Sequence, residues 1–349
     1  MKGSKLFKNV RLKGQKELVS ILVKDGIFKK IAADIPQEET VGCEEVDLNG
    51  QLVVPPYVDP HLHLDYVFTA SFGEKNGSGT LFEGIQRWSE SKGNITVEQM
   101  KERIYSGIRK EMLHGVQAIR THIDVTDPTF TGLKAALEVR DEVKDILDLQ
   151  IVAFPQEGMY AYKDGDKLVE EGLKMGADCV GAIPHFELAR EFGEKSGINF
   201  ISCPTENVYL EGRQDTYPKR RGITRVKELY DNGINVCFAQ DSMSDPWYPL
   251  GNGNMMMILN HGIHLAQMMS PEEITNVLDL VTTNGAVTMN ITDHYGIEEN
   301  KPANFIVLDA KSEFEAICER AGITASVRYG EFLFKKIPAK VTGAIDLLK

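Results

Sequence analysis

The apolar positions at the two ends of the chain come in short runs separated by turn residues. In the first fifty residues, the pair Asp25-Gly26 divides two apolar runs within the segment 19–28. An Asp-Gly pair in that position predicts a β-hairpin. The last fifty residues have the same character, with strand candidates at 303–308 and 331–334 around one helix at 314–321. The two ends are therefore predicted to form one small sheet domain.

Between the two ends, apolar strands alternate with amphipathic helices. The helix expected over 97–114 has Met100, Ile104, Ile108 and Met112 on one face. Strands that are buried on both faces appear as near-continuous apolar runs. Six such runs occur, at 52–58, 116–121, 149–154, 179–183, 198–202 and 234–238. This alternation predicts a parallel sheet with crossover helices, in one domain over about residues 55–300.

Composition and charge exclude several classes of protein. The 349 residues suffice for one large domain or two ordinary ones. With 39 basic and 51 acidic residues the net charge is −12, which repels nucleic acid and anionic membranes. No apolar run approaches the roughly 20 residues of a membrane span, and no signal peptide is recognisable, so a cytoplasmic protein is expected. The five scattered cysteines contain no C-x-x-C pair and are interpreted as reduced thiols.

The strongest chemical signal is the H-x-H pair at the end of the first middle strand. His61 and His63 follow the apolar run directly. Side chains alternate along a strand, so the two imidazoles lie on one face and point toward the same place. Neutral imidazole is a common ligand of divalent metals. Two ordinary surface histidines are the alternative interpretation.

Two further polar residues follow apolar strands. Asp241 comes after the strand at 234–238, and in a barrel of parallel strands the carboxyl ends share one pocket, where Asp241 can supply a third ligand. Gln156 follows the strand at 149–154, and its carboxamide matches the amide edge of a pyrimidine or another cyclic amide. A helix N-cap for Asp241 and a loop-capping role for Gln156 are the alternatives.

Seven segments of the chain resemble the bacterial cytosine deaminase branch of the amidohydrolase superfamily. They are PPYVDPHLHLD from residue 55, SGTLFEGIQRW from 78, RTHIDVTD from 120, LQIVAFPQEG from 149, GADCVGAIPHFE from 176, TYPKRRGITRVKEL from 216 and DPWYPLG from 245. The resemblance implies an α/β fold: a (β/α)8 barrel over 55–300 with a small β-sandwich from residues 1–54 and 301–349. It also implies hydrolytic loss of ammonia from a small ring and, more weakly, a homo-oligomer.

The resemblance also implies roles for individual residues. His61, His63 and Asp241 correspond to ligands of one divalent metal ion, Fe2+ or Zn2+, and Asp241 counts as catalytic. Gln156 corresponds to the residue that grips the amide edge of the ring, and Trp247 to part of the pocket wall. In the family, a glutamate three residues after a histidine ligand on the fifth strand protonates the leaving ammonia, and a further histidine stands on the sixth strand.

These last residues have no counterpart in the chain. The stretch 186–260 contains neither a histidine nor an H-x-x-E pattern. The family pattern runs to about 193–195 and resumes at 196, as though two β/α units of about 31 residues each were absent. Either the molecule carries a segment that this sequence omits, or the chain passes directly from strand four to strand seven. The first is favoured, because loss of two strands leaves unpaired edges, and a long Cα separation at 195–197 would show it.

If the units are truly absent, three protein ligands can still hold a metal. The acid–base substitutes would then be Glu157, His185 or Glu187, although the last two equally suit a structural histidine and a helix-start carboxylate. A catalytically inactive, barrel-derived binding protein becomes the rival hypothesis.

The substrate is first predicted to be cytosine. Ser242 stands where these deaminases generally have a second acidic residue, and Gln240 where a histidine precedes the metal aspartate. Both differences remove ionisable groups beside the substrate. A less charged, roomier corner would accept an extra methyl group or one ring atom fewer, so creatinine is the alternative.

Overall fold

A computed structural model describes residues 3–183, 199–217 and 222–337. It divides into two compact units. One contains residues 1–55 and 294–349, and the other contains residues 56–293. Each unit is described by itself below. Within the described ranges, every helix is too short or too polar to cross a membrane.

The unit formed by both chain ends is built on one mixed sheet. Its strand order is β14-β13-β12-β5-β1-β2-β3, with β4 beside β1. The strands are β1 (Lys5–Leu12), β2 (Leu18–Lys24), β3 (Ile27–Ala32), β4 (Glu44–Asp47), β5 (Leu52–Val54), β12 (Phe305–Leu308), β13 (Ile323–Arg328) and β14 (Glu331–Lys335). A short 3-10 helix, Gln37–Glu39, and α10 (Glu313–Cys318) complete the unit. The predicted hairpin is present, because β2 and β3 are antiparallel neighbours.

The turn of this hairpin follows from its two residues. Asp25 and Gly26 have φ values of 54° and 78°, in the left-handed region that a two-residue hairpin turn requires and that these residue types tolerate. The strands of the terminal unit form one continuous hydrogen-bonded sheet, whereas a sandwich was expected. The sheet nevertheless encloses a core, since Phe7 of β1 packs edge-on against Phe305 of β12 at 5.0 Å and Phe332 of β14 at 6.0 Å.

The middle unit contains two sets of parallel strands. The first set has the order β6-β7-β8-β9, and the second pairs β10 with β11. A single parallel bridge between Leu62 and Asp241 joins the two sets. The strands are β6 (Tyr57–Leu62), β7 (Val116–Asp124), β8 (Asp148–Phe154), β9 (Cys179–Val180), β10 (Phe200–Ser202) and β11 (Val236–Phe238). Across the bridge the order becomes β10-β11-β6-β7-β8-β9.

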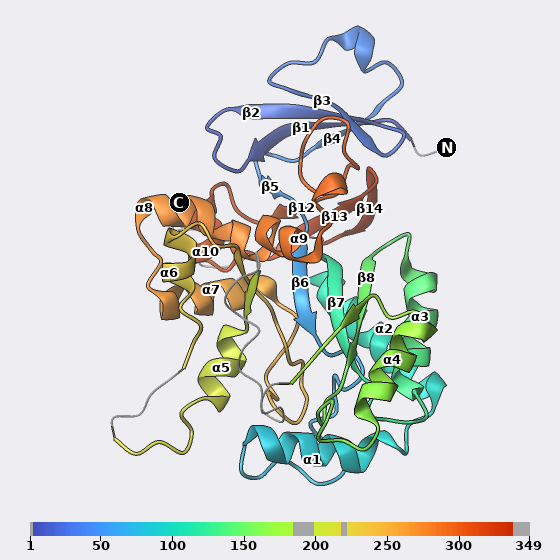
Figure 1. Cartoon of the computed structure of the whole chain (residues 1–349). Helices are drawn as coiled ribbons and strands as arrows, with labels where there is room; N and C mark the ends of the chain where they lie inside the picture. The colour runs from blue at the N-terminus through green and yellow to red at the C-terminus, as the bar shows by residue number, and fades with distance from the viewer. Residues whose placement is uncertain (1–2, 184–198, 218–221, 338–349) are drawn as a thin grey trace, which may run out of the picture. The chain divides into compact units, whose positions relative to one another are not determined.

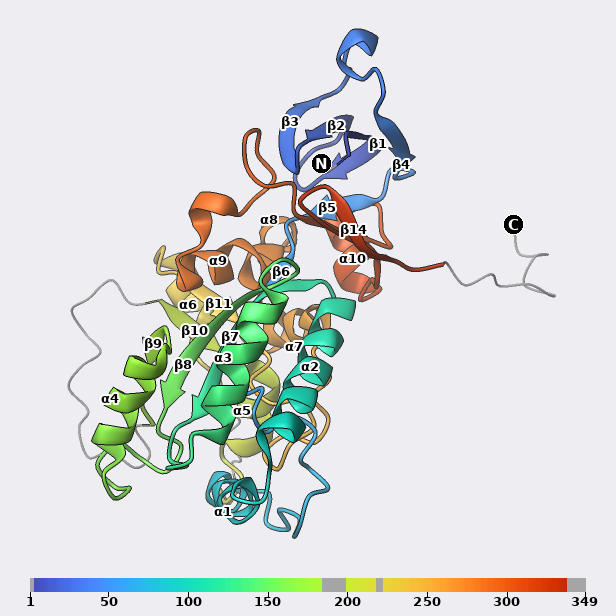
Figure 2. The ribbon, with the colours of Figure 1, turned by 90° about the vertical axis from the view of Figure 1, so that its right-hand side faces the viewer.

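Helices follow the strands of this unit in the predicted alternation. They are α1 (Leu81–Lys92), α2 (Val97–Leu113), α3 (Thr131–Val143), α4 (Gly165–Met175), α5 (Pro204–Leu210), α6 (Val226–Asp231), α7 (Met255–Ala266), α8 (Pro271–Asn276) and α9 (Thr283–Met289), with 3-10 turns at Val277–Val281 and Thr292–His294. Figures 1 and 2 show α2, α3 and α4 along one side of β7 and β8. On α2, Met100, Ile104 and Ile108 are buried as the helical spacing predicted.

Three strand predictions need correction. The run 52–58 is two strands, β5 and β6, which belong to different units, because Pro55 and Pro56 interrupt the backbone N–H groups that a continuous ladder needs. The run 179–183 is paired only over Cys179–Val180. Strand β13 was not predicted, although Ile323–Arg328 alternates apolar and polar residues as a strand with one buried face does.

The path of parallel strands has two ends in the described ranges. In the described ranges, β9 pairs with β8 alone and β10 with β11 alone, so the two ends of the six-strand path are consecutive in the chain. The segment that connects them includes 184–198, which lies outside the described residues, as does the Cα separation predicted at 195–197. The mixed α/β architecture is thus present, and the described ranges contain six parallel strands, whereas a (β/α)8 barrel has eight.

Candidate active site

Three predicted metal ligands converge where β6 and β11 end. Nε2 of His61 lies 3.2 Å from Oδ1 of Asp241, and Nε2 of His63 lies 3.5 Å from the same oxygen. The ligand atoms of all three residues lie within 4.8 Å of one another. Two imidazole nitrogens and one carboxylate oxygen form a donor set that suits Zn2+ or Fe2+.

The hydrogen bonds around His63 prepare its Nε2 to be a ligand. Its Nδ1 lies 3.0 Å from the carbonyl oxygen of His122. A carbonyl can only accept, so Nδ1 carries the proton and donates it. The lone pair on Nε2 is then free to face Asp241, in the arrangement that orients metal-binding histidines.

Backbone geometry places Asp241 beside the histidines. Its φ of 63° lies in the left-handed region, which aspartate tolerates better than most residues. Its backbone N–H donates to the carbonyl of His61 at 2.8 Å. The buried carboxylate of Asp59 accepts the backbone N–H groups of His61 at 3.2 Å and Gln240 at 3.3 Å. Asp59 thereby ties the end of β6 to the end of β11.

The charges of the triad balance one another. Burial lowers the pKa of the His61 imidazole, but the Asp241 carboxylate outweighs burial and leaves that pKa raised. At His63 burial dominates, so the pKa is lowered and the ring is neutral. Burial alone would raise the pKa of Asp241, but the two histidines hold it well below its usual range. A half-buried, ionised carboxylate between two imidazoles is a group that a divalent cation would neutralise.

Gln156 presents an unpaired acceptor. The residue follows β8, is 3% exposed, and its Oε1 is buried with no hydrogen-bond partner. A buried acceptor without a partner costs about 1–3 kcal/mol. The expected compensation is an N–H group of a bound molecule, since native proteins rarely leave such atoms unpaired.

Aromatic rings wall the site. Tyr66 stacks on His63 with 4.5 Å between ring centroids, and on its other side the ring of Trp247 lies 4.4 Å away. Trp88 of α1 contacts Tyr66 edge-on at 5.4 Å. Trp247 is buried and its Nε1 donates to the carbonyl of Leu81 at 3.1 Å. Trp247, the predicted wall residue, therefore contacts Tyr66, which in turn contacts the metal ligand His63.

Ser242 lies in a corner with two buried carboxyl groups. The Ser242 side chain lowers the pKa of both carboxyl groups, those of Glu206 and Asp245, against the effect of burial. Burial, followed by the charge of Asp241, raises the pKa of Glu206 well above its usual value. Burial raises the pKa of Asp245 to about 7, although its carboxylate accepts three backbone N–H groups in the loop that carries Trp247.

Sequence reasoning assigned no role to two residues near the triad. His122 of β7 lies with its ring centroid 3.9 Å from that of His61, and its Nδ1 is buried without a partner. Glu206 of α5 was missed because a glutamate two positions after Pro204 reads as an ordinary helix start. The reasoning that placed metal-binding histidines at the end of β6, applied to the end of β7, would have identified His122.

Of the three residues proposed as substitutes for the missing general acid, the structure describes Glu157. Glu157 is engaged elsewhere, with Lys92 at 2.6 Å and Ser89 at 3.2 Å. His185 and Glu187 lie outside the described residues. Gln240, which stands in place of a histidine, is fully buried, and its side chain donates to the Ser242 carbonyl at 2.9 Å and accepts from Gly253 N at 2.9 Å.

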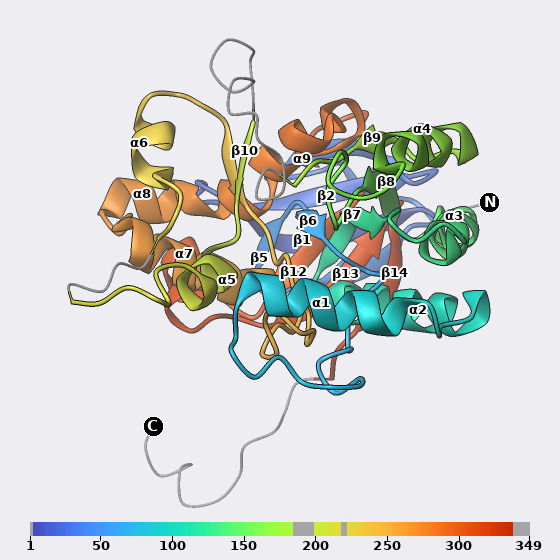
Figure 3. The same cartoon turned by 60° about the horizontal axis from the view of Figure 1, so that its bottom comes forward.

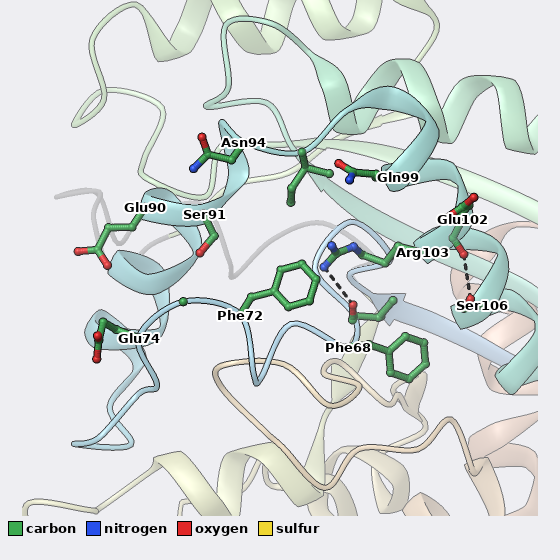
Figure 4. Close-up of a pocket in the computed structure, with 13 residues that line it drawn as sticks. Phe68, Phe72, Glu74, Glu90, Ser91, Asn94, Gln99, Glu102, Arg103 and Ser106 are labelled. Carbon is green, nitrogen blue, oxygen red and sulfur yellow. Dashed lines mark hydrogen bonds between the residues drawn. The ribbon is translucent and has the colours of Figure 1, made fainter.

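A separate pocket lies between the loop after β6 and helices α1 and α2. It has a volume of about 670 Å³. Arg103 donates to the carbonyl of Val67 at 3.4 Å, and Figure 4 shows Phe72 beside Arg103. The guanidinium lies 4.6 Å from the centre of the Phe72 ring. None of the predicted site residues lines this pocket, so the candidate site is the region around the triad and Gln156.

The chain is similar over most of its length to known amidohydrolases and deaminases. A model of the amidohydrolase family matches residues 187–329. The crystal structure of 5-methylcytosine deaminase from Klebsiella pneumoniae with 5-fluorocytosine superposes with a TM-score of 0.91 and 38% identity, covering 97% of this chain and 99% of that one. N-isopropylammelide isopropyl amidohydrolase of Pseudomonas sp. strain ADP is 25% identical over 84% of this chain and 88% of its own length. Pterin deaminase of Rhizobium rhizogenes is 22% identical over 91% and 88%.

The alignments also contain unmatched positions. The one with the Pseudomonas protein runs over 360 positions, more than the 349 residues of this chain, yet it includes only 84% of them. That relative therefore has segments without a counterpart here.

Proposed function

Because this chain belongs to the cytosine deaminase-like branch of the amidohydrolase superfamily, we propose that it hydrolytically removes the amino group of a small aminopyrimidine, cytosine or its 5-methyl derivative. The chain is a hydrolase that acts on C–N bonds, as its relatives are. The choice of ring is the proposal. The observation that carries it is the unpaired Oε1 of Gln156, two residues after Phe154, whose ring lies 5.2 Å from that of the triad residue His63.

The residues divide the work of such a reaction between them. His61, His63 and Asp241 would hold one divalent ion, which, when bound, lowers the pKa of water enough to supply a nucleophile at neutral pH. Gln156 accepts a ring N–H and so orients the ring. Tyr66 and Trp247 exclude water from one side of the site. Burial raises the pKa of the Glu206 carboxyl and so disfavours a second negative charge beside Asp241.

Ser242 supports a ring that carries a methyl group. A serine is smaller than an aspartate and carries no charge, so an apolar substituent meets a lower desolvation cost beside it. The relative with 38% identity is a 5-methylcytosine deaminase, which favours an aminopyrimidine over creatinine.

Ammonia release tests this proposal. The purified protein, loaded separately with Zn2+ and with Fe2+, is given cytosine, 5-methylcytosine and creatinine in parallel, with metal content measured for each sample. Release from either pyrimidine and not from creatinine is expected. Release from creatinine alone would replace the proposed substrate. Stoichiometric metal without ammonia from any of the three rings would favour an inactive binding protein.

We also propose that the molecule carries two further β/α units between β9 and β10. The support is that these strands are consecutive in the chain yet lie at opposite ends of the parallel strand path, and that the relatives have unmatched segments. The intact mass of the protein expressed from its gene is then expected to exceed that of the 349 residues by about 7 kDa, for roughly 60 residues. A mass equal to that of the printed sequence would overturn this proposal.

A further inference from the structure

One face of α1 touches both sides of the candidate site. Gly84, Trp88 and Lys92 are spaced by four residues and are all buried, so they form one stripe along the helix. A Cβ at Gly84 would lie 2.4 Å from Nε1 of Trp247, which shows how closely the helix approaches that indole. Figure 3 shows α1 stretching from the side of α5 to the side of α2. The stripe therefore runs from the loop after β11 to the loops after β7 and β8.

Lys92 ends this stripe in a buried ion cluster. Its ammonium donates to Asp124 Oδ2 at 2.9 Å, to Glu157 Oε1 at 2.6 Å and to Thr126 Oγ1 at 3.1 Å. The residue is 9% exposed, and buried lysines persist in proteins only when they are paired. Asp124 Oδ2 also accepts Nε1 of Trp88 at 3.0 Å. Three donated bonds from one cation thus join the end of β7 to the loop after β8.

The position of Glu157 connects this cluster to the substrate. Glu157 follows Gln156 directly, in a short turn closed by the Gly158 N–H donating to the Pro155 carbonyl at 2.9 Å. The Gln156 amide itself has no partner at Oε1 that could fix it from within. Glu157 therefore offers this turn a side-chain anchor to α1, with Lys92 as its charged partner and Ser89 as its neutral one.

We propose that Lys92 is a positioning residue that acts through Glu157 to hold Gln156 against the ring of the substrate. The proposal rests on the function proposed above. The proposal gives helix α1 a role in ring recognition, although Lys92 does not belong to the metal triad. A displacement of about 1 Å in such a group can lower the rate on the order of 100-fold. Loss of the ion cluster is therefore expected to weaken recognition of the ring.

A double-mutant cycle tests whether Lys92 acts through Gln156. K92M keeps most of the side-chain length and removes the charge, and K92R keeps the charge. Both of the chain's tryptophans, Trp88 and Trp247, lie in the site wall, so their fluorescence reports binding of cytosine to metal-free protein. K92M is expected to weaken ring binding and raise KM by about 10- to 100-fold, K92R to restore most of the binding, and metal content to remain unchanged.

In a Q156M background, K92M is expected to weaken cytosine binding little further, because the residue through which Lys92 acts is already replaced. Equal losses in both backgrounds would mean a general structural role and would overturn the proposal. K101M is the matched control, because Lys101 also bridges two carboxylates, Glu138 at 2.9 Å and Glu142 at 2.8 Å, on the outer helices. It should leave ring binding unchanged.

Amide hydrogen exchange gives a reading that needs no ligand. K92M, and not K101M, is expected to speed exchange at Gln156 and Gly158. Unchanged exchange there would overturn the positioning role even if the protein binds cytosine. Faster exchange in a protein that binds and deaminates no pyrimidine would instead count against the proposed function alone.

Discussion

The unpaired acceptor of Gln156 predicts that activity and stability oppose each other at this residue. Methionine has a similar volume and no polar atom that needs a strong partner, so Q156M removes the desolvated amide without leaving a large cavity. A buried unsatisfied acceptor costs about 1–3 kcal/mol, of which roughly 1 kcal/mol should be recovered on substitution. For a unit of this size, that corresponds to a rise in melting temperature of about 2–4 °C.

The same substitution should damage catalysis. Two hydrogen bonds between the carboxamide and the ring, at about 1.5 kcal/mol each, amount to roughly a 100-fold loss in kcat/KM. The assays are thermal unfolding of the metal-free protein and ammonia release from the metal-loaded protein. Metal content should not change, because Gln156 is not a ligand.

Gln150 of β8 provides a matched control. Its side chain is fully engaged, donating to the Met289 carbonyl at 2.8 Å and accepting from Nε of Arg120 at 3.0 Å. Q150M should therefore destabilise by about 1–2 kcal/mol and leave kcat/KM unchanged. If Q156M lowers the melting temperature as Q150M does, the amide of Gln156 has partners in the free protein and the reasoning is wrong. A kcat/KM within twofold of wild type would refute its contact with the ring.

Three further predictions concern the metal, the helix contact and pH. D241N should lose most of its bound metal on dialysis, measured by metal analysis, while its circular dichroism stays unchanged, because an amide no longer balances the cation. G84A should displace the indole of Trp247, shift the fluorescence and destabilise by about 1–3 kcal/mol, whereas an unaltered spectrum would contradict the close contact. Glu273, beside Lys227 and the Ser270 N-cap, has a pKa lowered to about 2. Its ionised form therefore stabilises the fold above the unfolded value of about 4.3 and ceases to do so as pH falls toward 2. E273Q keeps the capping box, so it should lower the free energy of unfolding by less than about 1 kcal/mol at pH 7. The difference in urea unfolding between E273Q and the wild type should vanish near pH 2.

The parts of the site that follow from strand geometry could be predicted from the sequence. Alternation along a strand put His61 and His63 on one face, and the shared carboxyl edge of parallel strands brought Asp241 to them. These rules depend on backbone periodicity and need no knowledge of the neighbouring side chains. The Asp25-Gly26 hairpin was equally accessible, because its turn conformation restricts the residue types that fit.

The parts of the site that depend on side-chain partners could not be predicted from the sequence. Lys92 reads as a solvated cation in the last turn of a helix, which is where lysine is usual. Its burial is decided by Asp124 and Glu157, which come from elements 32 and 65 residues away in the chain. Glu206 was missed for the same reason, since its pKa is set by burial and by Asp241 from another strand.

The arrangement of the parallel strands explains how the triad forms although β9 and β10 each have one partner strand in the described residues. His61 belongs to β6, His63 follows it directly and Asp241 follows β11, so the metal ligands lie at the joint between the two parallel sets. The Leu62–Asp241 bridge and the carboxylate of Asp59 close that joint through backbone hydrogen bonds. The unmatched edges, β9 and β10, lie at the two ends of the strand path, each separated from β6 by at least one other strand. Metal binding therefore depends on this joint between β6 and the end of β11.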